Sequence, residues 1–290
     1  MSFNNEIRNY DPLYDFLFMG YMASSGCERQ LTSLINAILV ENDENLVSEL
    51  EIVDNKSLPA NIMGKKSCIL DLRSVALDGR IINIEVQRQN EKFFKRRNQL
   101  YISREFSNSA DEGKFRFLKE HIQINILGFK FCENEKISQK FNIIDKTDIK
   151  CEYSQCIKII NISLVPFRKI KKIDFDNHLH RWLVFLDKNS TIEMVEMVMS
   201  KDEAIKLAHE KVKELLKDEK FLHKMNIESQ RELKYESEMA YAEDKGIKKG
   251  KKKGIEQGEL NIAKKLIEAG MSIEEIAKTT GLSIAKLEKL

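Results

Sequence analysis

The sequence predicts an α/β fold in which a mixed β-sheet is flanked by helices, with an α-helical C-terminal region. Apolar residues between Phe16 and Leu39 repeat at helical spacing, and short segments typical of strands follow them. Beyond His178 the pattern becomes helical again. A helical start, three strands, a helix and then more strands favour a sheet packed between helices.

The individual elements can be placed from apolar spacing and turn residues. Stripes from Phe16 to Met22 and from Leu31 to Leu39 predict two helices. Strands are expected near Leu50–Val53 and over residues 68–76, 80–87, 122–131, 139–144 and 157–165. Further helices are expected over residues 88–111, with Gly113 as a C-cap, and over 182–186 and 201–224.

Composition limits the function classes only loosely. The 290 residues are 42% hydrophobic, enough for one large domain or for a smaller domain with an appendage. Lys and Arg total 48 against 46 Asp and Glu, so any basic surface for nucleic acid must be local. The five cysteines are scattered and form no CxxC pair, which predicts a reduced, intracellular protein without a zinc site.

The chain carries no sign of membrane targeting. It has no apolar run of the length that a membrane-spanning helix needs. Its first ten residues are polar and do not resemble a signal peptide. We therefore expect a cytoplasmic protein with no membrane partner.

Four regions are expected along the chain. Residues 1–190 form the α/β domain, 191–245 a helical extension, 246–260 a Gly/Lys-rich linker or helix, and 261–290 a small helical tail. In the tail, Gly270 closes one helix, and Ser272 with Glu275 forms a capping box for the next. This order of helix, turn and helix fits a helix-turn-helix that binds DNA or, equally, a helical element that binds protein.

The informative segment is a hairpin over residues 68–87. A three-residue loop, Leu77-Asp78-Gly79, requires a left-handed residue, and Gly79 provides it. This loop sets the register, in which Arg73 faces Asn83 and Asp71 faces Glu85. A two-residue turn would shift the register and put Asp71 and Glu85 on opposite faces.

Two opposed carboxylates in this register have Cβ atoms roughly 5 Å apart. They repel each other unless a cation lies between them, and Mg²⁺ prefers such oxygen ligands. The side chain of Gln87 points to the same face, where it can orient an attacking water. The alternative is the solvent-exposed face of an antiparallel sheet, which commonly carries polar residues.

Several segments resemble the Rpn family of recombination-promoting nucleases, also described as PD-(D/E)XK nuclease family transposases. The resemblance covers nearly the whole chain. It is carried by DFLFMGYM (15–22), GCERQLTSLINAIL (26–39), SCILDLRSVALDGRIINIEVQ (67–87), RNQLYISREF (97–106), WLVFL (182–186) and IAKKLIEAGMSIEEIAKTTGLS (262–283). It implies a restriction-endonuclease-like PD-(D/E)XK core.

The resemblance also implies roles for individual residues. Asp71 and Glu85 match metal-binding and catalytic acidic positions, and Gln87 stands where the superfamily pattern has Lys. Asp15 matches an N-terminal acidic residue that helps to hold metal, although a carboxylate is favoured at any helix start. Met19 stands where a Lys is expected in related proteins, which weakens phosphate contact.

Basic residues after the hairpin suit a DNA backbone. Arg88, Arg96 and Arg97 are candidate phosphate contacts. Tyr101, one helical turn after Arg97, matches the family pattern and is a candidate for the same surface. A solvated helix face is the commoner explanation of such charges.

We therefore expect a Mg²⁺-dependent DNA endonuclease linked to recombination or mobile elements. It can form homo-oligomers through its C-terminal helical region. One alternative is a weakly active or inactive DNA-binding or oligomerising protein that retains a degenerate nuclease fold. Another is a partner-binding module with no affinity for DNA.

Overall fold

The fold is known from a computed structural model that describes residues 10–53, 72–109, 118–133 and 136–290. The chain divides into two units, Met1–Met225 and Asn226–Leu290. The sheet and the helices that cover it belong to the first unit, and most of one long helix belongs to the second.

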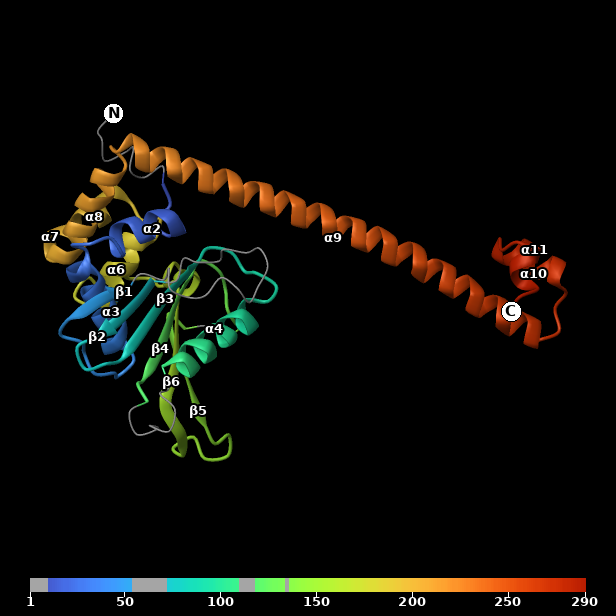
Figure 1. The fold of residues 1–290 in the computed structure, drawn as a ribbon, viewed down its shortest axis with the longest axis horizontal. Coiled ribbons are helices and arrows are strands. Elements are labelled where there is room, and N and C mark those ends of the chain that lie inside the picture. The colour runs from blue at the N-terminus through green and yellow to red at the C-terminus, as the bar shows by residue number, and fades with distance from the viewer. Residues whose placement is uncertain (1–9, 54–71, 110–117, 134–135) are drawn as a thin grey trace. The chain divides into compact units, whose positions relative to one another are not determined.

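A six-stranded sheet lies at the centre of the first unit (Figure 1). Its order is β1-β2-β3-β4-β6-β5, with β3, β4 and β6 parallel and the other neighbours antiparallel. The predicted mixed sheet is therefore confirmed. The strands are β1 (Leu50–Val53), β2 (Leu72–Ala76), β3 (Ile81–Gln87), β4 (His121–Leu127), β5 (Ser138–Ile144) and β6 (Glu152–Ser163).

Helices lie on both sides of this sheet (Figure 1). One group packs against the apolar face, and α4 (Phe94–Asn108) lies on the other side. The group comprises α2 (Asp15–Met22), α3 (Glu28–Glu41), α6 (His178–Leu186), α7 (Ile192–Lys201) and α8 (Glu203–Leu215). The short helix α5 (Leu164–Phe167) follows β6 directly.

The main core forms between the apolar face and its helices. Alternate residues of a strand point to opposite faces, so Ile82, Ile84 and Val86 of β3 all join this core. The neighbouring strands contribute Ile122, Ile124, Ile126, Ile160 and Ile162. The residues between them therefore point toward α4.

The predicted hairpin register is confirmed over the described residues. Arg73 pairs with Asn83 and Leu72 with Ile84. The amide of Gly79 donates to the carbonyl oxygen of Ala76 over 2.8 Å, and Gly79 has φ +87°. The expected pair of Asp71 with Glu85 lies outside the described residues, since these resume at Leu72.

Some element boundaries differ from the predicted ones. Helix α4 begins at Phe94 rather than at 88, so Arg88 and Lys92 lie in the preceding loop. The segment expected as one helix over 201–224 is divided after Leu215, because the Asp218 carboxylate accepts hydrogen bonds from the Lys220 and Phe221 amides and starts a new helix. The predicted C-cap at Gly113 lies outside the described residues.

That new helix is α9 (Glu219–Glu268), which continues into the second unit. Residues 246–260, expected as a linker or a helix, are helical. The helix ends before Gly270, which has φ +81°. The short helices α10 (Ile273–Thr280) and α11 (Ile284–Leu287) follow, and the predicted Ser272–Glu275 capping box is present.

Candidate active site

The face of the sheet that α4 covers carries a row of polar side chains. Glu85 of β3, Asn125 of β4 and Asn161 of β6 stand side by side, because the parallel register pairs Glu85 with Asn125 and Asn125 with Asn161. All three are buried. The alternative of a solvent-exposed polar face does not hold here, because α4 lies over these residues.

Asn98 of α4 joins this row to the helix. Its Nδ2 donates to Glu85 Oε2 over 3.1 Å and to Asn125 Oδ1 over 2.7 Å. Asn125 in turn donates to Asn161 Oδ1 over 2.7 Å, and Gln123 donates to Asn125 Oδ1 over 3.2 Å. A buried amide without a partner lowers the stability of the fold. The hydrogen bonds among these amides therefore hold Asn98 in place against the Glu85 carboxylate.

Arg97 holds the other oxygen of the same carboxylate. Its Nη2 donates to Glu85 Oε1 and to Gln87 Oε1, both over 2.8 Å, while Nη1 binds the exposed Glu91. Gln87 also donates from Nε2 to the carbonyl oxygen of Gln89 over 3.1 Å and to Glu91 Oε1 over 3.2 Å. We call these eight residues the polar network: Glu85, Gln87, Glu91, Arg97, Asn98, Gln123, Asn125 and Asn161.

The predicted site residues divide into three groups. Glu85, Gln87 and Arg97 come together in the polar network. Arg88 directly follows β3, and its guanidinium carbon lies 4.8 Å from the centre of the Tyr14 ring. Because Tyr14 immediately precedes Asp15, the start of α2 lies near the end of β3. Arg96 is exposed on α4, and Tyr101 is half-buried one turn beyond Arg97.

Asp71 lies outside the described residues. Among the residues that are described, no three His, Cys, Asp or Glu side chains gather closely enough to hold a metal ion. Glu85 does have the chemistry for such an ion. An ionised carboxylate can accept about four hydrogen bonds, and the Arg97 and Asn98 contacts leave lone pairs for a hard cation.

The sequence prediction missed Asn98, Gln123, Asn125 and Asn161. A signal for two of them was present, because Gln123 and Asn125 interrupt an isoleucine-rich strand at alternate positions. Asn98 offered no signal of its own, since a polar residue on a helix is usually solvated.

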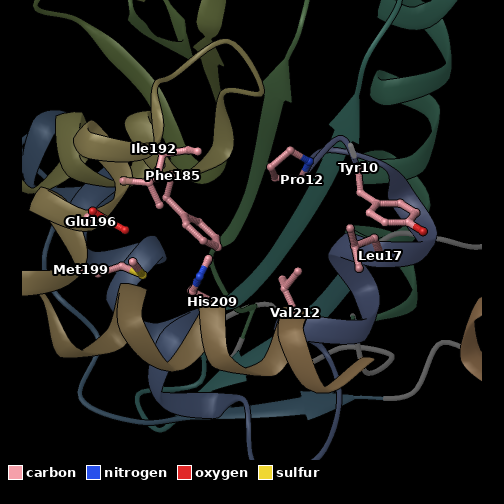
Figure 2. Close-up of a pocket in the computed structure, with 10 residues that line it drawn as sticks. Tyr10, Pro12, Leu17, Phe185, Ile192, Glu196, Met199, His209 and Val212 are labelled. Carbon is pink, nitrogen blue, oxygen red and sulfur yellow. The ribbon is translucent and has the colours of Figure 1, made fainter. Parts of the chain in front are cut away.

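Two hollows in the first unit lie apart from the polar network. One, of about 40 Å³, is apolar, and Figure 2 shows Phe185 and Leu17 among its lining residues. The other is lined by ion pairs, with Glu44 bound to Lys158 over 2.7 Å and to Lys140 over 2.9 Å. Burial alone would raise the pKa of Glu44, but these two ammonium groups hold it below its usual value.

His178 and His180 lie two residues apart in the sequence, and both have structural contacts. His178 Nε2 lies 3.1 Å from Ser33 Oγ and 3.0 Å from Asp202 Oδ2. A serine-histidine-aspartate relay needs the two partners on different ring nitrogens, so this contact is not such a relay. His180 Nδ1 accepts a hydrogen bond from the Asp174 amide.

Comparison with known proteins identifies the family. The model of the PD-(D/E)XK nuclease family transposases matches residues 12–248, which include the sheet, α4 and the whole polar network. No curated protein and no solved structure matches the chain. The match covers most of the sequence and agrees with the mixed sheet flanked by helices. The chain therefore belongs to the PD-(D/E)XK nuclease family transposases.

Proposed function

We propose that the protein is a divalent-metal-dependent DNA endonuclease, with Mg²⁺ as its metal. The observation that carries the proposal is the Glu85 carboxylate, which is buried yet held at both oxygens by Arg97 and Asn98. Burying a carboxylate is unfavourable unless it is paired, and the sequence resemblance matches Glu85 to the acidic residue of the (D/E)XK element.

Glu85 and Asp71 would hold the metal, with Asp15 as a further ligand. The register of the described part of the hairpin supports this choice, because Arg73 lies opposite Asn83. The same register, continued for two residues, would put Asp71 opposite Glu85. When bound, Mg²⁺ supplies a water of lowered pKa and stabilises negative charge on the phosphate. Gln87 orients the attacking water from its place beside Glu85.

Arg97 contributes the positive charge that Gln87 lacks. Its guanidinium is hydrogen-bonded to both Glu85 and Gln87, so a permanent cation lies next to the residue that is Lys in the superfamily pattern. The charge comes from α4 instead of β3. We infer that Arg97 stabilises the phosphate during cleavage, while Arg88, Arg96 and Tyr101 contact the DNA backbone.

The family description names transposases, and we propose recombination or mobile-element activity in the cytoplasm as the biological setting. Homo-oligomers through the C-terminal helical region also belong to this proposal. Among the helices that the structure describes, none has both the length and the apolar run needed to cross a membrane.

Cleavage of supercoiled plasmid tests the proposal. Wild type with Mg²⁺ is expected to nick or linearise the plasmid, and EDTA is expected to stop it. Asp71→Ala should abolish cleavage while leaving the far-ultraviolet circular dichroism spectrum unchanged. Binding of DNA without cleavage by any form would replace the proposal with the alternative of an inactive DNA-binding protein.

A further inference from the structure

The second unit presents an exposed apolar face along α9. Leu233, Ile247, Ile255 and Ile262 are each more than half exposed, at 62%, 62%, 54% and 54%. Together with Ala240 they recur every seven or eight residues. Because two helical turns take about 7.2 residues, these five side chains lie on one side of the helix. We call this set the α9 face.

The C-terminal helices do not cover the α9 face. They pack instead around Ala263, which is fully buried with Ile276, Leu282 and Leu287. The preceding residue, Ile262, stays 54% exposed. The Lys286–Glu256 ion pair lies on the same side of α9 as Ala263, since 256 and 263 are two turns apart.

The charges of α9 are separated along its length. Residues 228–244 carry six acidic and two basic side chains, a net charge of −4. Residues 245–261 carry six basic and two acidic side chains, a net charge of +4. Two such helices side by side in parallel would place like charges together. An antiparallel arrangement places each acidic half against a basic half.

We propose that two copies of this chain pair through their α9 faces in antiparallel orientation, with the two-fold axis near Ile247 and Lys248. Leu233 then packs near the partner's Ile262, and Ala240 near the partner's Ile255. Asp244 lies beside the partner's Lys251, and symmetry repeats each contact. The interface thus combines an apolar seam with charge complementarity, as in coiled coils.

Two of the four glycines of α9 fit this arrangement. Gly258 lies on the α9 face and Gly254 lies beside it. In the single chain, a Cβ added at either position would meet nothing within 4 Å. Glycine weakens a solvent-exposed helix, and residues without side chains let a second helix approach closely. Gly254 and Gly258 are therefore better explained by a paired helix than by a solvated one.

Sedimentation of the full chain tests the pairing. The wild type is expected at twice the monomer mass of 33.8 kDa at micromolar concentration. Ile255→Glu, which would face the partner's acidic half, should raise the dissociation constant by at least about tenfold, the change expected when a buried interface anchor is lost. Circular dichroism checks that α9 remains helical in this variant.

Charge reversal tests the orientation. Asp244→Lys and Lys251→Asp should each weaken the dimer, because each change creates two like-charge contacts. An equimolar mixture of the two variants should restore it, since every contact then joins opposite charges. Lys249→Glu is the matched control, because it reverses a charge on the other side of the helix.

Several outcomes would overturn the proposal. A wild-type chain that stays monomeric rules out the dimer, and a dimer whose dissociation constant is unchanged by Ile255→Glu rules out this face. Failure of the mixture to recover rules out the antiparallel order. If Lys251→Asp lowers affinity for duplex DNA and leaves the mass unchanged, the basic half is a DNA contact instead. None of these measurements depends on DNA cleavage, so failure of the dimer proposal can be distinguished from failure of the nuclease proposal.

Discussion

Asn98 of α4 and Glu85 of β3 are joined by a 3.1 Å hydrogen bond that links the helix to the buried carboxylate. The same amide nitrogen donates to Asn125, so one side chain connects α4 with two strands. Asn98 is thus a positioning residue for the candidate site. The sequence resemblance predicts a role for Glu85, and the structure adds Asn98 as a residue that holds the Glu85 carboxylate.

Replacing Asn98 by Leu should lower the free energy of unfolding by about 1–3 kcal/mol, because Glu85 and Asn125 each lose a buried partner. Urea denaturation measures the change. Gln99→Ala, an exposed neighbour on α4, is the control and should alter stability by less than about 0.5 kcal/mol. Equal effects of the two variants would show that the Asn98 contacts contribute no stability.

Gln87→Lys restores the superfamily residue, yet it should lower cleavage. Gln87 Oε1 accepts a 2.8 Å hydrogen bond from Arg97, and a Lys ammonium would remove this acceptor and add a like charge. We expect plasmid cleavage below the wild-type rate and a loss of stability of about 1 kcal/mol. An increase in cleavage would contradict the role assigned to Arg97.

Acid should destabilise the fold through His121. This side chain is buried, its Nδ1 lies 3.0 Å from the Lys119 carbonyl oxygen, and burial lowers its pKa below 6.5. Glu105 opposes that shift and Arg73 adds to it. Below about pH 6.5 the histidine binds a proton in the unfolded chain but not in the folded chain. The free energy of unfolding therefore falls as the pH falls.

The free energy of unfolding, measured by urea denaturation between pH 7.5 and about 5.5, should therefore decline more steeply in the wild type than in His121→Gln. Both proteins share the remaining titrating groups, so the difference between their slopes isolates His121. Identical slopes would mean that the histidine titrates normally in the fold.

Gly79→Ala should destabilise the hairpin. Gly79 has φ +87°, and an added Cβ would lie 2.5 Å from the Nζ atom of Lys119. Lys119 can move, but the left-handed backbone still costs about 1 kcal/mol for a residue with a Cβ. Thermal unfolding should show a lower midpoint, whereas Gly246→Ala, in open space on α9, should not lower it.

Local sequence patterns were sufficient for the hairpin and the tail. Gly79 determined the register that pairs Arg73 with Asn83, and Ser272 with Glu275 determined the start of α10. Both depend on residues close in sequence, whose backbone preferences are strong. The family resemblance then assigned a role to Glu85.

Long-range relationships could not be predicted in the same way. The row from Glu85 to Asn161 exists because β6 pairs with β4 while β5 lies at the edge, an order that no local pattern encodes. The cover of α4 over that row is likewise a tertiary contact. Residues such as Asn98 therefore become visible only when the strands and the helix are assembled.

The most direct test of the proposed nuclease is cleavage of supercoiled plasmid by wild type and Glu85→Ala across a Mg²⁺ titration, with Glu91→Ala as an exposed control from the same network. Wild type should cleave in a Mg²⁺-dependent manner, Glu91→Ala should lose at most a modest part of this activity, and Glu85→Ala should not cleave. Cleavage by Glu85→Ala at the wild-type rate and with the same Mg²⁺ dependence would contradict the metal-binding role of Glu85.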